Sequence, residues 1–72
     1  MVNVNKLRGR IVEKGLTIEQ VAKKLGVNAS TVYRKLANNG EGLTVGDANR
    51  LCKILELTGA EATAIFFSQV VA

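Results

Sequence analysis

The sequence predicts an all-α domain of five short helices. Its 72 residues contain no proline, and apolar residues recur at the spacings of three and four that mark a helix face. Thr17, Thr44 and Thr58 each stand three residues before Gln, Asp or Glu, a pattern typical of capped helix N-termini. We expect residues 1–72 to form a single domain.

The first two helices are bounded by glycines. The first is expected over residues 5–14, with Gly15 as its stop. Thr17 opens the second helix, and Gly26 ends it because a left-handed backbone suits a residue without a Cβ. The expected apolar stripe of the second helix consists of Ile18, Val21, Ala22 and Leu25.

The third helix follows after a very short connection. Only Val27 separates Gly26 from Asn28, a good N-cap for a helix over residues 29–37. Such a connection suits two helices that cross at a steep angle. A loop is then expected over residues 38–43, because it contains an Asn-Gly pair and a further glycine.

The fourth and fifth helices begin at Thr44 and Thr58. Cys52 lies on the apolar stripe of the fourth helix, which favours a structural thiol over a redox switch. The expected buried positions are Ala48, Leu51, Cys52 and Leu55, followed by Ala62, Ile65 and Phe66 in the fifth helix.

Composition argues against several classes of protein. A single cysteine excludes an internal disulfide and suggests a reducing compartment. With no histidine and one cysteine, the chain has too few ligands for a zinc finger, and its six carboxylates are scattered. We therefore expect no metal, no cofactor and no enzyme activity. The N-terminus lacks the pattern of a signal peptide, and no apolar run approaches the roughly 20 residues of a membrane span. We therefore expect a cytoplasmic protein, in a bacterial cell or a phage-infected host.

Positive charge is concentrated in the N-terminal half. Residues 1–35 carry eight Lys and Arg against two Glu, a balance of +6, whereas residues 36–72 carry two against four, a balance of −2. A segregated positive charge indicates a polyanionic partner such as nucleic acid. The alternative is the solvated surface of ordinary charged helices.

Residues 18–37 carry the most specific signal. A short amphipathic helix, a glycine-centred turn and a second helix follow one another, with Ala22 where the two helices would cross and Val27 and Val32 at the junction. This pattern, with a core of about residues 17–38, resembles the helix-turn-helix of the lambda-repressor-like (Cro/cI/XRE) family. The resemblance covers about residues 7–67, and it is closest to small phage-type transcriptional regulators.

The resemblance implies a sequence-specific regulator that binds double-stranded DNA with the third helix in the major groove. If Val32 and Leu36 face the core, the opposite side of that helix is free to read bases. The expected base-reading residues are Ala29, Ser30, Tyr33 and Arg34. The residues expected to contact the DNA backbone are Thr17, Asn28, Thr31, Lys35 and Asn38.

Several of these residues have alternative roles. Tyr33 could cover an edge of the core, Arg34 could pair with Glu41, and Ser30 and Thr31 could simply satisfy first-turn N–H groups. The chain also departs from the family pattern at two positions. Ile18 replaces a glutamine that often contacts phosphate, and Lys35 replaces an apolar residue, so its stem would cover the core while its ammonium reaches outward.

The C-terminal segment is more apolar than one buried stripe requires. An exposed apolar patch at the end of a small domain suggests self-association, and the resemblance implies a homodimer on a palindromic operator. The residues expected to hold the dimer, on a helix or tail over about 59–72, are Phe67, Val70 and Val71. The tail could instead fold back to complete a thin core.

A second function class remains open. A helix-turn-helix fold can also act as a protein-interaction module, for example an antitoxin-like partner or an antirepressor adaptor. The basic third helix argues against this alternative, and salt-dependent binding to duplex DNA distinguishes the two.

Overall fold

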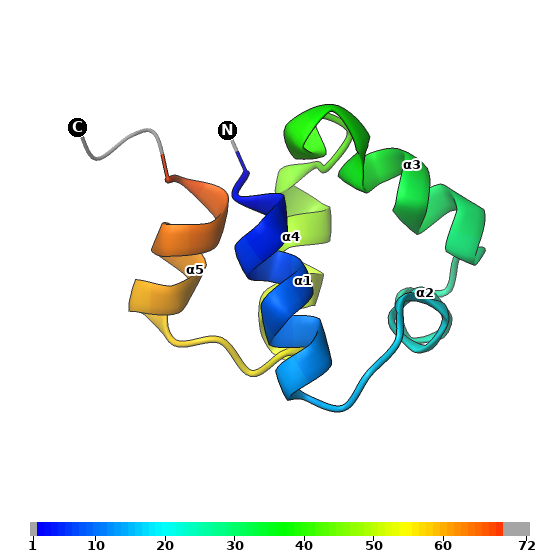
Figure 1. Ribbon diagram of the computed structural model, residues 1–72, viewed down its shortest axis with the longest axis horizontal. Coiled ribbons are helices and arrows are strands. Elements are labelled where there is room, and N and C mark those ends of the chain that lie inside the picture. The colour runs from blue at the N-terminus through cyan, green and yellow to red at the C-terminus, as the bar shows by residue number, and fades with distance from the viewer. Residues whose placement is uncertain (1, 69–72) are drawn as a thin grey trace.

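Five helices follow one another along the chain, as the sequence predicts (Figure 1). The computed structural model describes residues 2–68, and within that range no strand forms. The helices are α1 (Val4–Glu13), α2 (Ile18–Leu25), α3 (Ala29–Gly40), α4 (Val45–Ile54) and α5 (Gly59–Phe66). The expectation of an all-α helix-turn-helix fold is confirmed.

The three threonine capping boxes form as predicted. The Thr17 hydroxyl accepts from the backbone N–H of Gln20 at 3.2 Å, and the Gln20 side chain accepts from the Thr17 N–H at 2.8 Å. The boxes at Thr44 and Thr58 open α4 and α5 in the same reciprocal way. Each box satisfies N–H groups that a helix N-terminus otherwise leaves unpaired, so local sequence alone places these three helix starts.

Helix α3 differs from its expected bounds at its C-terminal end. Right-handed helical geometry stops after Leu36, because Ala37 is extended (φ −64, ψ 160), and Asn38 and Asn39 adopt left-handed conformations (φ 53 and 60). Asparagine is among the few residues that tolerate this region. Gly40 (φ 77) completes the tight turn, where a Cβ would lie 2.8 Å from that of Val2. The expected loop therefore starts one residue early, with an ordered turn.

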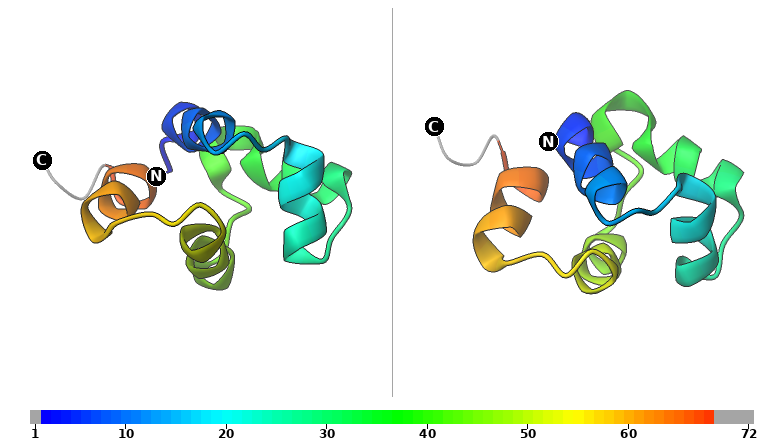
Figure 2. Two further views of the ribbon diagram at one scale, coloured as in Figure 1. Left: turned by 90° about the horizontal axis from the view of Figure 1, so that it is seen from below. Right: turned by 60° about the horizontal axis from the view of Figure 1, so that its bottom comes forward.

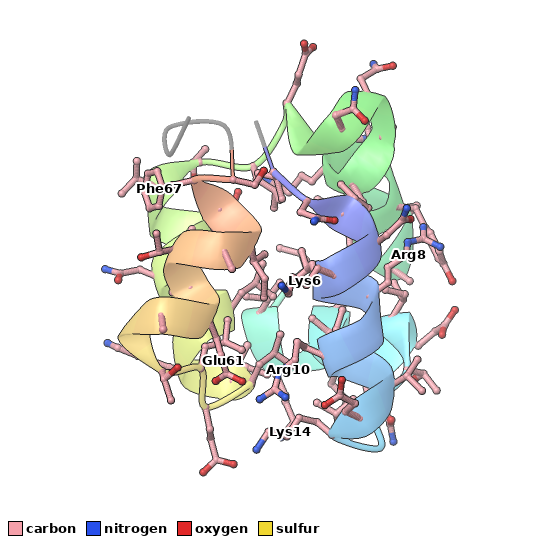
Figure 3. The ribbon with its side chains drawn as sticks, turned by 60° about the vertical axis from the view of Figure 1, so that its left-hand side comes forward. Lys6, Arg8, Arg10, Lys14, Glu61 and Phe67 are labelled. Atoms are coloured by element: carbon pink, nitrogen blue, oxygen red, sulfur yellow. The ribbon has the colours of Figure 1, made fainter. Side chains whose placement is uncertain are left out.

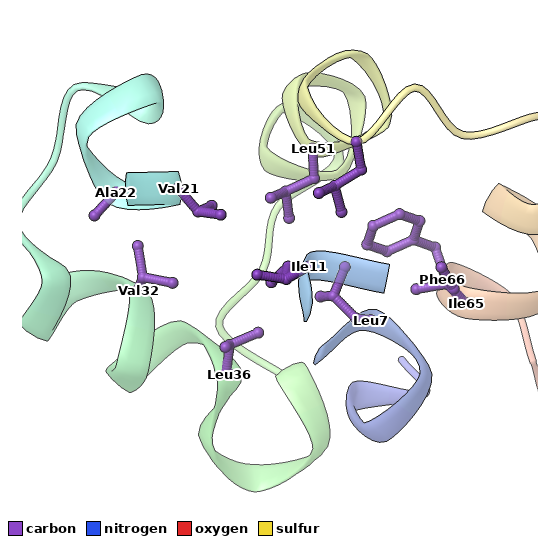
Figure 4. Close-up of a cluster of buried hydrophobic side chains, with 10 residues drawn as sticks. Leu7, Ile11, Val21, Ala22, Val32, Leu36, Leu51, Ile65 and Phe66 are labelled. Atoms are coloured by element: carbon purple, nitrogen blue, oxygen red, sulfur yellow. The ribbon is translucent and has the colours of Figure 1, made fainter. Parts of the chain in front are cut away.

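All five helices, with the residues that cap them, contribute to one buried cluster (Figure 4). Its members are Leu7, Ile11, Val21, Ala22, Val32, Leu36, Leu51, Leu55, Ile65 and Phe66. Ala48, Cys52 and Ala62, which the sequence also predicts as buried, are only partly covered and pack against the cluster from its rim. The core thus fixes α3 by two of its residues and leaves the opposite side of the helix in solvent.

Helices α2 and α3 lie at one end of the long axis and α5 at the other, with α1 and α4 between them (Figures 1 and 2). The backbone N–H of Asn3 donates to the carbonyl oxygen of Ile65 at 2.7 Å, which ties the start of α1 to α5. The N-terminal part of α3 and the outer face of α5 lie toward opposite ends of the molecule (Figures 1 and 2). Of the helices that the structure describes, none has the length and apolar character to cross a membrane.

Candidate nucleic-acid interface

The turn between α2 and α3 is closed by backbone hydrogen bonds. Gly26 adopts the left-handed conformation predicted for it (φ 76), and the N–H of Val27 donates to the Ala22 carbonyl at 3.0 Å. This is the pattern of a Schellman C-cap, which turns the chain sharply away from the helix axis. Val27 was expected to seal the junction together with Val32; Val32 is buried, but Val27 is 38% exposed.

The outward side of α3 follows from the positions that it buries. Because Val32 and Leu36 belong to the core, Ser30, Tyr33 and Arg34 point into solvent on the opposite side. Ala29 differs from this group, because it is only partly exposed and packs against the buried cluster. Three of the four expected base-reading residues thus have exposed side chains, and Ala29 exposes only part of its methyl group.

Arg34 carries an unengaged guanidinium. No ion pair or side-chain hydrogen bond within residues 2–68 involves it, and the alternative pairing with Glu41 does not form. Its planar fork of N–H donors is therefore available to an external acceptor. Guanine O6 and N7 in the major groove match that fork in a bidentate contact.

Tyr33 reaches from α3 toward α2. Its ring is 45% exposed, and its hydroxyl donates to Oε2 of Glu19 across 3.4 Å, a long contact. Glu19 lies in the first turn of α2 and is itself exposed. A carboxylate at this edge of the outward surface was not anticipated from the sequence, because the contact joins residues in different helices.

The residues expected to contact the DNA backbone differ in how free they are. Asn28 precedes α3 but makes no side-chain cap, so its exposed amide has no partner among the described residues. Asn38 is exposed in the left-handed turn, and Thr31 is half-buried. The Thr17 hydroxyl accepts the capping bond from Gln20 and retains its own proton to donate.

Lys35 is held by a partner that the sequence did not predict. Its Nζ lies 2.8 Å from Oδ2 of Asp47, whose side chain is almost fully buried. Asp47 was expected only to cap α4, and it does so by accepting from the Thr44 N–H at 2.9 Å. Lys35 stands at a position that is normally apolar, and this departure could have predicted an acidic partner, since a half-buried ammonium needs a counter-charge.

The environment of Asp47 favours its ionised form. Burial opposes ionisation, but the hydrogen bonds from Lys35, the Thr44 backbone and Arg50 outweigh it and lower the pKa of Asp47 to about 2. Elsewhere, burial raises the pKa of the Cys52 thiol, in keeping with a structural role. No group of three potential metal ligands occurs among residues 2–68.

Ion pairs divide the basic residues of the N-terminal half into two sets. Arg10 bridges Glu13 and Glu61, at 2.8 and 2.9 Å, in the gap between α1 and α5 (Figure 3), and Lys14 pairs with Glu56 at 3.0 Å. With Lys35, these are the neutralised cations. The basic residues of this half with no acidic partner in the described structure are Lys6, Arg8, Lys23, Lys24 and Arg34.

Comparison with known proteins identifies one family. The model of the Cro/C1-type helix-turn-helix DNA-binding domain matches residues 6–63, which is most of the chain. That range contains α2, α3 and the turn between them. No curated protein and no solved structure matches the chain with significance.

Proposed function

The chain belongs to the Cro/C1-type helix-turn-helix DNA-binding domain family, and from that membership we propose that it is a sequence-specific transcriptional regulator. Helix α3 enters the major groove of double-stranded DNA, while α2 crosses the sugar-phosphate backbone. The observation that carries the proposal is the exposed row Ser30, Tyr33 and Arg34, which lies opposite the buried Val32 and Leu36. The resemblance to small phage-type regulators supports a repressor or Cro-like role.

Base reading in this proposal follows from the chemistry of that row. Arg34 reads guanine through its free guanidinium, and Ser30 serves as a short donor or acceptor at a neighbouring base. The Tyr33 ring, with the partly exposed methyl of Ala29, covers a thymine methyl group. The N-terminal position of these residues in α3 agrees with the part of a recognition helix that reaches base edges.

Contacts to the DNA backbone set the orientation of the domain. We assign them to the unpartnered amides of Asn28 and Asn38, the hydroxyls of Thr17 and Thr31, and the ammonium of Lys35. The unpaired cations Lys23 and Lys24 near the end of α2 add a general attraction for phosphates. Such contacts carry affinity but no sequence information.

A selection from random duplexes tests this function. The pure protein is incubated with a library of random double-stranded DNA at about 0.1 M salt, and bound duplexes are sequenced after several rounds. We expect one enriched motif, and affinity for it that falls steeply with salt concentration. Absence of any enriched motif, with an affinity that is insensitive to salt, would contradict the proposal and favour a protein-interaction module.

The binding unit is proposed to be a homodimer on a palindromic operator. Phe67, directly after α5, is 53% exposed, and Val45 at the start of α4 is 84% exposed. A shallow apolar groove of about 550 Å3 runs along α5 beside the Phe67 ring. Its lining residues are Gly59, Ala60, Thr63, Ala64, Phe67 and Ser68.

This surface suits a two-fold contact. An apolar side chain beside an apolar groove on the same face lets two copies fill each other's grooves, as an isologous interface requires. Two recognition helices related by that axis would read half-sites about 34 Å apart. Val70 and Val71, the other two residues expected to hold the dimer, lie outside the described residues.

A further inference from the structure

The edge of the α3 surface that faces α2 carries a carboxylate. Glu19, in the first turn of α2, places Oε2 3.4 Å from the Tyr33 hydroxyl, so the acid lies beside one of the proposed base-reading side chains. Both residues are exposed. The Glu19 carboxylate therefore lies at the hydroxyl end of the Tyr33 side chain.

Glu19 differs from most acidic residues of the chain in having no counter-charge. Of the six acids, all within residues 2–68, four form ion pairs: Glu13, Asp47, Glu56 and Glu61. Glu19 and Glu41 have none. The only acid beside Tyr33 is thus a bare negative charge on a surface that is proposed to approach a polyanion.

A bare carboxylate on such a surface has two physical effects. It is repelled by phosphate groups, so it weakens binding wherever the DNA backbone comes close. It also accepts hydrogen bonds strongly, and the donors that a major groove offers are the exocyclic amino groups, cytosine N4 and adenine N6. The repulsion lowers the affinity for any duplex whose phosphates lie close to Glu19. The hydrogen bond raises the affinity for a duplex that places an amino group beside the carboxylate.

We infer that Glu19 is a specificity-determining residue, which accepts a hydrogen bond from an exocyclic base amino group next to the base covered by Tyr33. The inference rests on the proposed function and deepens it. Oε2 faces the Tyr33 hydroxyl, while Oε1 makes no contact within the described residues and is free for the base. The hydroxyl orients the carboxylate, and the carboxylate in turn keeps the phenol at the α2 edge of α3.

The test compares two carboxylate deletions that change net charge equally. Glu19→Ala and the control Glu41→Ala are each titrated with the duplex selected by the wild-type chain and with a scrambled duplex of the same composition. We expect both variants to bind the scrambled duplex a few-fold more tightly. Only Glu19→Ala should lose discrimination, with the ratio of selected to scrambled affinity falling about tenfold.

Repeating the selection with Glu19→Ala identifies the donor. One base pair of the motif should lose its preference, and whether that pair is C·G or A·T distinguishes cytosine N4 from adenine N6. Tyr33→Phe should disturb the same base pair or its neighbour, but less, because the ring and the carboxylate both remain.

Two results separate the inference from the function on which it rests. If the wild-type chain does not discriminate between the selected and scrambled duplexes, the proposed function fails and the role of Glu19 fails with it. If the wild type discriminates but Glu19→Ala and Glu41→Ala strengthen binding to both duplexes equally, Glu19 only adds negative charge and this inference alone is overturned.

Discussion

The ammonium of Lys35 lies 2.8 Å from the carboxylate of Asp47 and joins α3 to the first turn of α4. The same carboxylate accepts from the Thr44 backbone at 2.9 Å and from an Arg50 guanidinium nitrogen at 3.1 Å. One buried acid therefore caps a helix and holds the proposed recognition helix in place. Because two of its three donors are cationic, its removal would leave Lys35 half-buried without compensation.

Asp47→Ala is expected to lower the free energy of unfolding by about 2–4 kcal/mol, since it removes a cap and two charged hydrogen bonds at once. Urea denaturation followed by circular dichroism at pH 7 measures the loss. Gln20→Ala is the matched control, because Gln20 also completes a threonine capping box but forms no ion pair, so its loss should cost only about 1 kcal/mol. Equal losses in the two variants would show that the Lys35 ion pair adds nothing.

Stability should depend on pH in the acid range through Asp47. Its folded-state pKa of about 2 lies below the value of 3.8 for a free side chain, so the folded state favours the ionised acid. The resulting stabilisation, about 2 kcal/mol, is fully present above pH 4 and is lost as pH falls through 2. Asp47→Asn, which cannot ionise, should show a shallower decline than the wild type between pH 4 and 2. Parallel declines would contradict the assignment.

Lys35 is expected to contact a DNA phosphate while its ammonium remains paired with Asp47. Its ammonium has N–H donors beyond the one held by Asp47, and the side chain is 27% exposed. Lys35→Met should reduce the slope of log affinity against log salt by about one unit. Lys53→Met, an equal charge change on an exposed position of α4, is the control and should leave the slope unchanged. If both variants leave the slope unchanged, Lys35 pairs with Asp47 and does not contact phosphate.

Helix starts could be predicted because their causes are local. Each threonine box lies within four residues, and its hydrogen bonds form between the residues that the sequence pattern names. The end of α2 at Gly26 is equally local. The exposed side of α3 could be predicted from helical periodicity, because the burial of Val32 and Leu36 places Arg34 on the side that faces solvent.

What the sequence did not predict depends on contacts between helices. Nothing local marks Asp47 as buried or pairs it with Lys35, since the two residues lie on either side of a turn. The Tyr33 contact with Glu19 likewise requires the α2–α3 crossing to be built first. The early end of α3 reflects two consecutive left-handed asparagines, a conformation that each residue tolerates but does not demand.

Arg34→Ala should weaken binding to the selected duplex by about 1–3 kcal/mol and relax preference at one base position. The free guanidinium makes this a clean deletion, because no intramolecular pair is broken. Lys24→Ala, also exposed and unpaired, is the control and should weaken binding to selected and random duplexes alike. If Arg34→Ala behaves as the control does, Arg34 contacts phosphate rather than guanine.

Phe67→Ala should separate dimerisation from base reading. A single α3 contacts only a few base pairs, so tight binding to a palindrome requires two copies held together. Removing the exposed ring beside the α5 groove removes the side chain proposed to fill the groove of the second copy, while the buried Phe66 and its neighbours keep the monomer folded. The double variant with Val71→Ser extends the test to the segment that follows.

We expect the double variant to keep its helical circular dichroism, to sediment as a monomer, and to bind a full palindrome far more weakly while its affinity for one half-site is unchanged. Val12→Ser is the control, because Val12 in α1 is also an exposed apolar side chain (72% exposed) but does not line the α5 groove. It should bind the palindrome as the wild type does. The base-reading residues of α3 are the same in every variant compared, so a difference in affinity for the palindrome reports on the contact between the two copies. If the double variant also binds the palindrome with wild-type affinity, two copies meet through another surface.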